Sequence, residues 1–155
     1  MPDNDGTIYA DLINFLQSDR NDIRESAAEA ALSVATDRNH RQNLTKYDVV
    51  TPLTRLITHP GKSGYNSLAA LVHLTAADDV TARAAAEDIL SCGGVNRVVE
   101  VGLSYDGGCG GNGDEEEAAR HVNHAVSLLS NLTRSEDGAG RLLLPFEEEE
   151  KRRRE

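Results

Sequence analysis

The sequence has little cysteine, and its amino terminus does not resemble a signal peptide. Only two cysteines, Cys92 and Cys109, occur in 155 residues. A domain of this length can bury a core without disulfides, and thiols in a chain without a secretory signal normally stay reduced. The first residues, MPDNDG, lack the basic and then apolar order of a signal peptide. We therefore expect a cytoplasmic protein with free thiols.

Long apolar runs and an excess of positive charge are also missing. The longest apolar candidate, residues 142–146, falls far short of the roughly 20 residues that cross a bilayer. The formal net charge of −10 opposes long-range attraction to nucleic acid and to anionic membranes. These absences predict no membrane and no nucleic-acid partner, and they favour another protein as the partner.

The sequence does contain an internal repeat. The segments ALSVATD from Ala31, ALVHLTA from Ala70 and LLSNLTR from Leu128 share their apolar positions and a Thr in the sixth place. Upstream of each lies a second matched element, with helical i, i+3, i+4 spacing, that begins at Leu12, Leu53 or Val95. These starts are 41 and 42 residues apart, within the roughly 40–47 residue period of armadillo and HEAT repeats. The pattern predicts an all-α fold, an armadillo/HEAT-like α-solenoid of about three repeats.

The helices expected from periodicity and turn residues are residues 7–18, 21–37, 46–58, 65–76, 79–91, 94–104, 115–133 and 136–144. No strand is predicted. The segment Thr81 to Leu90 could be the short first helix of an armadillo triad, and the two-helix geometry of HEAT repeats is the alternative.

Two segments fall outside this pattern. Residues 105–114, YDGGCGGNGD, are half glycine and predict a loop inserted within the third repeat. Residues 146–155 form a charged tail in which four glutamates stand four residues ahead of Lys151 and three arginines, as in a solvated helix. The repeat domain is therefore expected to span residues 1–145.

The two ends of the solenoid are expected to differ. The polar MPDNDG segment is predicted to cap the first repeat, whereas Leu142 to Phe146 leave an apolar edge at the other end. Apolar edges of soluble proteins are usually covered. This edge, with Leu143 and Phe146, is therefore a candidate for partner binding or for a homodimer contact.

The stretch VNHAVSLLSNLTRSEDGAGRLLL, Val122 to Leu144, resembles the HGH-one homologue family of eukaryotic armadillo-type proteins, and SLAALVHLTA at Ser67 is similar to a second helix of that family. A glycine-bearing turn at 92–94 follows, as in that family. The likeness covers roughly residues 46–144. Members of the family are more than twice as long as this chain. The resemblance implies a chaperone adaptor that links translation elongation factor 2 to the cytosolic chaperonin.

The resemblance also implies a role for Asn131, because the last helix of an armadillo repeat commonly carries an Asn that faces the groove. In the same register stand Val34 and His73, so Asn131 and His73 are candidate protein-binding residues. The alternative is that Asn131 and Thr133 bond the helix end and neighbouring carbonyls. Asn131-Leu132-Thr133 is also a glycosylation pattern, which we instead interpret as the end of a core-forming helix.

No residue set predicts an enzyme, a cofactor or a metal. His121 and His124 have a spacing that allows a shared metal, but the cysteines lack the Cys-x-x-Cys spacing of structural zinc sites. We expect one histidine to pack on the neighbouring repeat and the other to be exposed. Gly61-Lys62-Ser63 imitates a phosphate-binding loop, but the glycine required at position 56 is a leucine. Ser91, His73 and Asp78 are near one another in sequence alone.

The sequence thus favours a protein-binding solenoid similar to the elongation-factor adaptor family. The alternative is a generic armadillo scaffold or fragment that self-associates through its carboxy-terminal apolar edge.

Overall fold

A computed structural model describes residues 4–104, 114–136 and 138–140, and the regular structure in these ranges is entirely α-helical. Eight helices are defined there: α1 (Asn4–Leu16), α2 (Asn21–Ala35), α3 (Arg38–Lys46), α4 (Val50–Leu56), α5 (Lys62–Thr75), α6 (Val80–Ser91), α7 (Gly94–Ser104) and α8 (Asp114–Leu132). The predicted all-α fold class is confirmed. None of the helices in these ranges is both long enough and apolar enough to cross a membrane.

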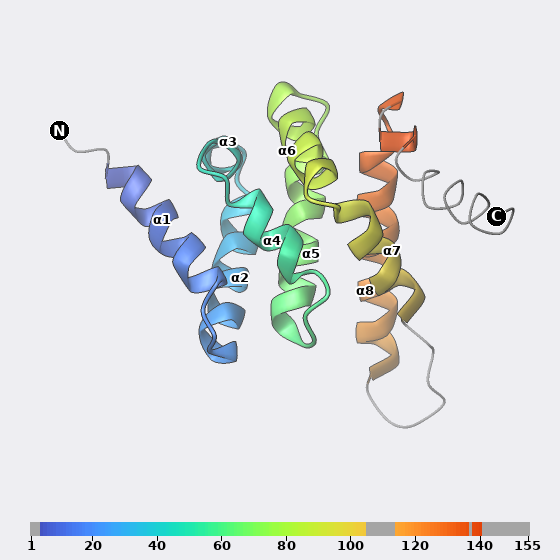
Figure 1. The fold of residues 1–155 in the computed structure, drawn as a ribbon, viewed down its shortest axis with the longest axis horizontal. Coiled ribbons are helices and arrows are strands. Elements are labelled where there is room, and N and C mark those ends of the chain that lie inside the picture. Colours follow the sequence, from blue (N-terminus) through green and yellow to red (C-terminus); the bar gives the residue numbers. More distant parts are fainter. Residues whose placement is uncertain (1–3, 105–113, 137, 141–155) are drawn as a thin grey trace, which may run out of the picture.

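The helices stack in parallel rows (Figure 1). One row consists of α2, α5 and α8, in which α5 contacts both neighbours, and a second consists of α1, α4 and α7, again with contacts between neighbours. The shorter α3 contacts α6 at one edge of the array. Because α5 also contacts α4 and α6, it is the helix around which the others are arranged.

The contact between α2 and α5 is the most extensive in the array. All buried residues of α2 are alanines, namely Ala27, Ala28, Ala31 and Ala35, and the buried residues of α5 include the small Ser67, Ala69 and Ala70 beside larger leucines. Short side chains let two helix axes approach closely. The larger core residues, such as Leu53, Leu71 and Leu128, fill the space between the two rows.

The short helices α3 and α6 begin and end in the same way. Asp37 and Asp79, 42 residues apart, are their N-caps, and each carboxylate accepts a backbone N–H of the first turn at 2.8 Å. Such a cap is worth about 1 kcal/mol. Both helices are followed by a left-handed residue, Asp48 at φ 57° and Gly93 at φ 74°, which turns the chain into α4 or α7.

The repeated Thr in the sixth place of each matched segment also has one structural role. The hydroxyls of Thr36, Thr75 and Thr133 each donate to a backbone carbonyl three or four residues earlier, at 2.7, 2.8 and 2.9 Å. The carbonyls in the last turn of a helix lack intrahelical partners or have weakened ones. The three threonines therefore make the same kind of side-chain bond at equivalent helix ends.

The predicted helix bounds were correct for α7 and close for α1, α2, α5, α6 and α8. The prediction of one helix over residues 46–58 was wrong, because Lys46 is the last residue of α3 and α4 covers only Val50–Leu56. Leu44 is the one buried residue of α3, so that helix has no apolar periodicity to detect. Residues 136 and 138–140 are helical as predicted. The predicted loop at 105–113, the end of that last helix and the charged tail lie outside the described residues, and Asp114 already belongs to α8.

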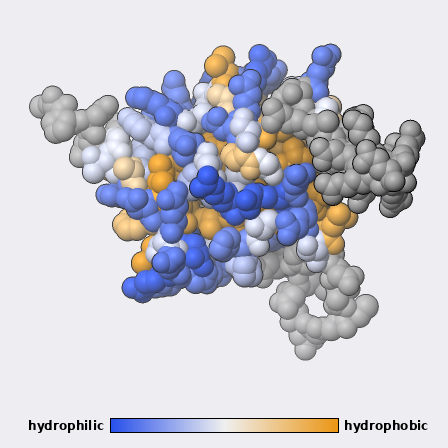
Figure 2. Space-filling model, viewed as in Figure 1, coloured by the Kyte–Doolittle hydropathy of each residue, from blue (hydrophilic) through white to orange (hydrophobic). Residues whose placement is uncertain are grey.

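The prediction of a polar cap at the amino-terminal end was also wrong for the part that the structure describes. Helix α1 starts within that segment, at Asn4, and exposes Ile8 (58%) and Phe15 (52%). Figure 2 shows hydrophobic patches over α1 and also over the middle of the same face, between hydrophilic areas. Phe15 precedes Leu56 by 41 residues and Val98 by 83, and both of those are buried. The equivalent position is thus apolar in α1, α4 and α7, but its side chain is buried only in α4 and α7.

The close approach of Gly64 predicts a large effect of one methyl group. A Cβ there would lie 2.1 Å from the carbonyl oxygen of His59 and 3.0 Å from that of Ile57, so the backbone would have to shift. We expect Gly64→Ala to lower the free energy of unfolding by about 1–3 kcal/mol, measured by thermal unfolding. Gly102→Ala is the matched control, because its Cβ would meet only Ala125, at 4.0 Å. Equal melting temperatures for the two variants would contradict this account.

Candidate functional site

Side chains from three helices meet on the face formed by α2, α5 and α8. They line a shallow hollow of about 510 Å³. Its lining residues are Glu29 and Leu32 from α2, Lys62, Tyr65 and Asn66 from α5, and Glu116 and Arg120 from α8. Glu116 and Arg120 form an exposed ion pair one helical turn apart, which contributes little to stability. The hollow therefore offers an aromatic ring, amide groups and charges of both signs.

Tyr65 is the centre of an aromatic cluster between α5 and α8. Its ring centroid lies 5.7 Å from that of His121 and 5.3 Å from that of His124. The Tyr65 hydroxyl is 3.3 Å from Nε2 of His124, within hydrogen-bonding distance. The expectation that one histidine is exposed was wrong, since both are half-buried against the same ring. Helical spacing of three places both imidazoles on the side of α8 that faces Tyr65.

The environment of His124 disfavours its protonated form. Burial, and secondarily the charge of His73, hold the pKa of His124 below its ordinary value of 6.5. A neutral imidazole can either donate to or accept from the Tyr65 hydroxyl, whereas an imidazolium can only donate. The cluster is thus built for the uncharged histidine.

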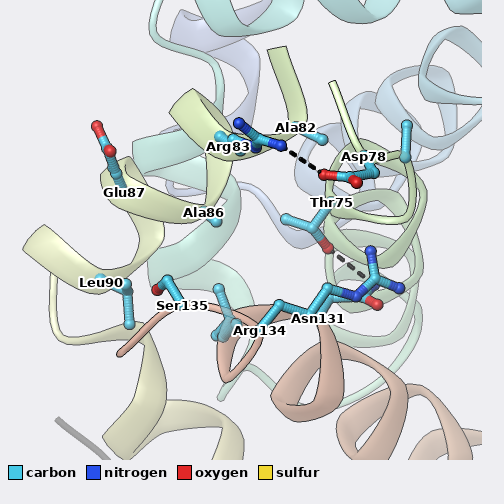
Figure 3. Close-up of a pocket in the computed structure, with 12 residues that line it drawn as sticks. Thr75, Asp78, Ala82, Arg83, Ala86, Glu87, Leu90, Asn131, Arg134 and Ser135 are labelled. Atoms are coloured by element: carbon cyan, nitrogen blue, oxygen red, sulfur yellow. Dashed lines mark hydrogen bonds and ion pairs between the residues drawn. The ribbon is translucent and has the colours of Figure 1, made fainter. Parts of the chain in front are cut away.

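Asn131 lies in the last turn of α8 and is half-buried. Its Nδ2 donates to Oγ1 of Thr75 at 3.1 Å (Figure 3). The same Nδ2 donates to the carbonyl oxygen of Val72 at 3.5 Å. Both acceptors lie on α5. This is the arrangement expected if the Asn131 amide bonds acceptor groups of a neighbouring helix. Leu132 beside it is buried, so the interpretation of Asn131-Leu132-Thr133 as the end of a core-forming helix is confirmed.

A second hollow, of about 290 Å³, lies next to Asn131, between α6 and the ends of α5 and α8 (Figure 3). Arg83 pairs with Asp78 across its rim at 2.8 Å, and this hydrogen bond is the main reason that the pKa of Asp78 is lowered. Arg134 donates to the carbonyl oxygen of Ala76 at 3.2 Å, where a cation is favoured by the helix dipole. Four polar side chains of this hollow are therefore engaged in pairs, Arg83 with Asp78 and Asn131 with Thr75.

The other predicted site residues are not brought together. His73 has an exposed side chain, Val34 is half-buried on α2, and no hydrogen bond joins either of them to Asn131 in the described part of the chain. Leu143 and Phe146 lie outside the described residues. Of these three residues, Asn131 is the one whose side chain hydrogen-bonds to another helix in the described part of the chain, so the shared register does not form a continuous polar row.

The residues considered for chemistry also stay apart. The Ser91 hydroxyl donates to the carbonyl of Glu87 and Asp78 is paired with Arg83, so these two and His73 form no hydrogen-bonded triad. Within the described ranges no group of three or more His, Cys, Asp or Glu residues could hold a metal ion. The thiol of Cys92 donates to the carbonyl of Asp88 at its own helix end.

The Tyr65 cluster was missed by sequence reasoning. The spacing of His121 and His124 was visible, but their partner lies 59 residues before His124. The matched segments from Ala70 and Leu128 place α5 and α8 in equivalent positions of neighbouring repeats. This match could have indicated that the two helices pack against each other.

Comparison with known proteins adds no relative: no family model, no curated protein and no solved structure matches the chain.

The lowered pKa of His124 predicts acid-dependent loss of stability. As pH falls through about 6.5, the unfolded chain binds a proton that the folded chain resists, so the free energy of unfolding decreases. We expect His124→Gln, which keeps a hydrogen-bonding group near Tyr65, to make melting temperature less dependent on pH between 7.5 and 5 by this linkage. His40→Gln, at an exposed position on α3, is the control. A pH dependence that is unchanged in His124→Gln would refute the assignment.

Proposed function

We propose that the chain is an armadillo-like solenoid of three repeats, the first formed by α1 and α2, the second by α3 to α5 and the third by α6 to α8. Three kinds of recurrence support this division. The helices α1, α4 and α7 carry the matched positions Leu12, Leu53 and Val95. The helices α2, α5 and α8 end in equivalent threonines, and α3 and α6 share Asp caps and left-handed turns.

The proposed function is the binding of another protein on the face formed by α2, α5 and α8. The observation that carries it is the half-buried Tyr65, which lines an open hollow beside the amide of Asn66. An extended peptide offers a backbone donor and acceptor at each residue, which side-chain amides can bind. Tyrosine contributes a large contact area at low cost in conformational entropy, as at many protein interfaces.

The resemblance of residues 46–144 to the HGH-one homologue family suggests which partner to expect. We propose a cytoplasmic adaptor, not an enzyme, that binds elongation factor 2 or the cytosolic chaperonin of a eukaryotic cell. The acidic balance of the chain, at −10, is compatible with a protein partner.

Self-association is the second candidate function, and one observation favours it. Ile8 and Phe15 are seven residues apart on α1 and give that helix an exposed apolar stripe at the amino-terminal end of the array. Exposed apolar patches on soluble proteins often mark contact surfaces. The predicted apolar edge with Leu143 and Phe146 would be a second such surface.

Co-purification with a tagged chain tests both candidates. We expect elongation factor 2 or chaperonin subunits to be recovered with the wild type, and about tenfold less of them with Asn66→Arg, which places a long charged side chain in the hollow. Asn96→Arg is the matched control, because Asn96 is exposed on α7, outside the hollow. Bound chains would be quantified by mass spectrometry.

Equal recovery with Asn66→Arg and Asn96→Arg would rule out the face formed by α2, α5 and α8 as the binding surface. Recovery of the protein itself and of neither client would favour self-association over the adaptor function.

A further inference from the structure

Helix α3 carries more positive charge than any other helix that the structure describes. It carries Arg38, His40, Arg41 and Lys46 and no acidic residue, in a chain with a formal net charge of −10. Leu44 is its one buried residue, and most of its polar side chains are exposed. A locally cationic helix on an acidic protein is a surface on which a negatively charged group is attracted at short range.

The helices α3 and α6 contact each other at one edge of the array (Figure 1). A hollow of about 320 Å³ lies between them. On the α3 side it is lined by Arg38, Asn39, Arg41 and Gln42, all of which carry N–H donors. On the α6 side Thr81 adds a hydroxyl. Guanidinium groups with neighbouring amides form a donor set that suits a carboxylate.

The donors of this hollow are largely available. Arg41 is half-buried, and its Nη1 donates to the carbonyl oxygen of His73 at 3.4 Å, which positions the side chain. The side chain of Arg38 forms no hydrogen bond or ion pair with any residue in the described ranges. Asp79 is the one acidic lining residue, and its Oδ1 already accepts the backbone N–H of Ala82 as the cap of α6.

Val80 gives the hollow an apolar rim. Its side chain is 81% exposed, the largest exposed fraction among the large hydrophobic residues that the structure describes. It follows Asp79 directly and lies on the side of the hollow opposite α3. A ligand that reaches the arginines can therefore also cover the two methyl groups of Val80, which removes apolar surface from water.

We propose that the hollow between α3 and α6 binds an acidic peptide segment, with an Asp or Glu side chain on Arg38 and Arg41 and an adjacent aliphatic side chain on Val80. The asymmetry of the hollow, with donors on one wall and an apolar rim on the other, fits a peptide that combines both groups. Nucleic acid and polyphosphate fit less well, because they carry a charge on every unit, which the acidic chain as a whole repels, and offer no aliphatic side chain to cover the exposed Val80. This surface is distinct from the face formed by α2, α5 and α8, and the inference does not depend on the function proposed for that face.

Fluorescence anisotropy with a short labelled peptide of alternating Glu and Val residues tests the proposal. We expect wild-type protein to bind this peptide in a salt-dependent manner, and to bind the corresponding Gln and Val peptide at least about tenfold more weakly, because each charge-assisted hydrogen bond contributes more than a neutral one. Equal binding of the two peptides, or no binding of the Glu peptide, would overturn the proposal.

Variants of the two arginines test whether the peptide binds in this hollow. Arg38→Gln removes an exposed charge without touching the core, and Arg38→Gln combined with Arg41→Gln removes both guanidinium groups. We expect the double variant to weaken binding about tenfold or more and the single variant to weaken it less. Arg20→Gln is the matched control, since Arg20 is also exposed and lies in the turn between α1 and α2, away from α3.

Three further results would overturn the proposal. The first is unchanged binding by Arg38→Gln and by the double variant, with melting temperatures equal to that of the wild type. The second is equal weakening by Arg20→Gln, which would indicate a nonspecific charge effect. The third is tighter binding of a single-stranded oligonucleotide than of the Glu peptide, with loss in the double variant, which would assign the site to a polyanion.

Discussion

The close contact between α2 and α5 sets the spacing of the whole helix array. Small buried residues on both helices, such as Ala28 and Ala31 of α2 and Ala70 of α5, allow the helices to approach. Since α5 also contacts α4, α6 and α8, its position determines where each of them packs. Ser67 of α5 is also buried, and its hydroxyl has no hydrogen-bond partner among the described residues. Burying an unsatisfied hydroxyl costs about 1–3 kcal/mol. The small size of this side chain thus comes with an unfavourable polar group inside the core.

Much of the fold was predictable because most helices bury one apolar stripe. Helices α1, α2, α5, α7 and α8 have this periodicity, and their existence was correctly predicted. Helix α3 was not, since Leu44 is its one buried residue and its stability comes from a cap and a turn. The 42-residue spacing of Asp37 and Asp79 was the signal that would have identified it. The exposed stripe of α1 could not be inferred from composition, because Phe15 has the same apolar character as its buried counterparts.

The candidate sites were less predictable because they depend on contacts between distant segments. The sequence singled out Asn131, but which group its amide contacts was decided by the approach of α8 to Thr75 on α5. Likewise, two histidines on one helix were evident, whereas their packing on Tyr65 required the positions of both helices. Lys62 was noted in an incomplete phosphate-binding pattern, and the structure instead places it in the hollow shared by three helices. Periodicity identifies which side chains are buried, but the partner of each polar side chain depends on tertiary packing.

The sparse anchoring of α3 has a consequence for its dynamics. Local opening requires little free energy where few apolar contacts must be broken, and α3 is secured mainly by Leu44, the Asp37 cap and the hydrogen bond between Arg41 and His73. Its amide protons should therefore exchange with solvent faster than those of α5, in transient openings that leave the central rows intact. A molecule that contacts α3 together with α6 would close these openings, so that ligand occupancy and the lifetime of one short helix become thermodynamically coupled.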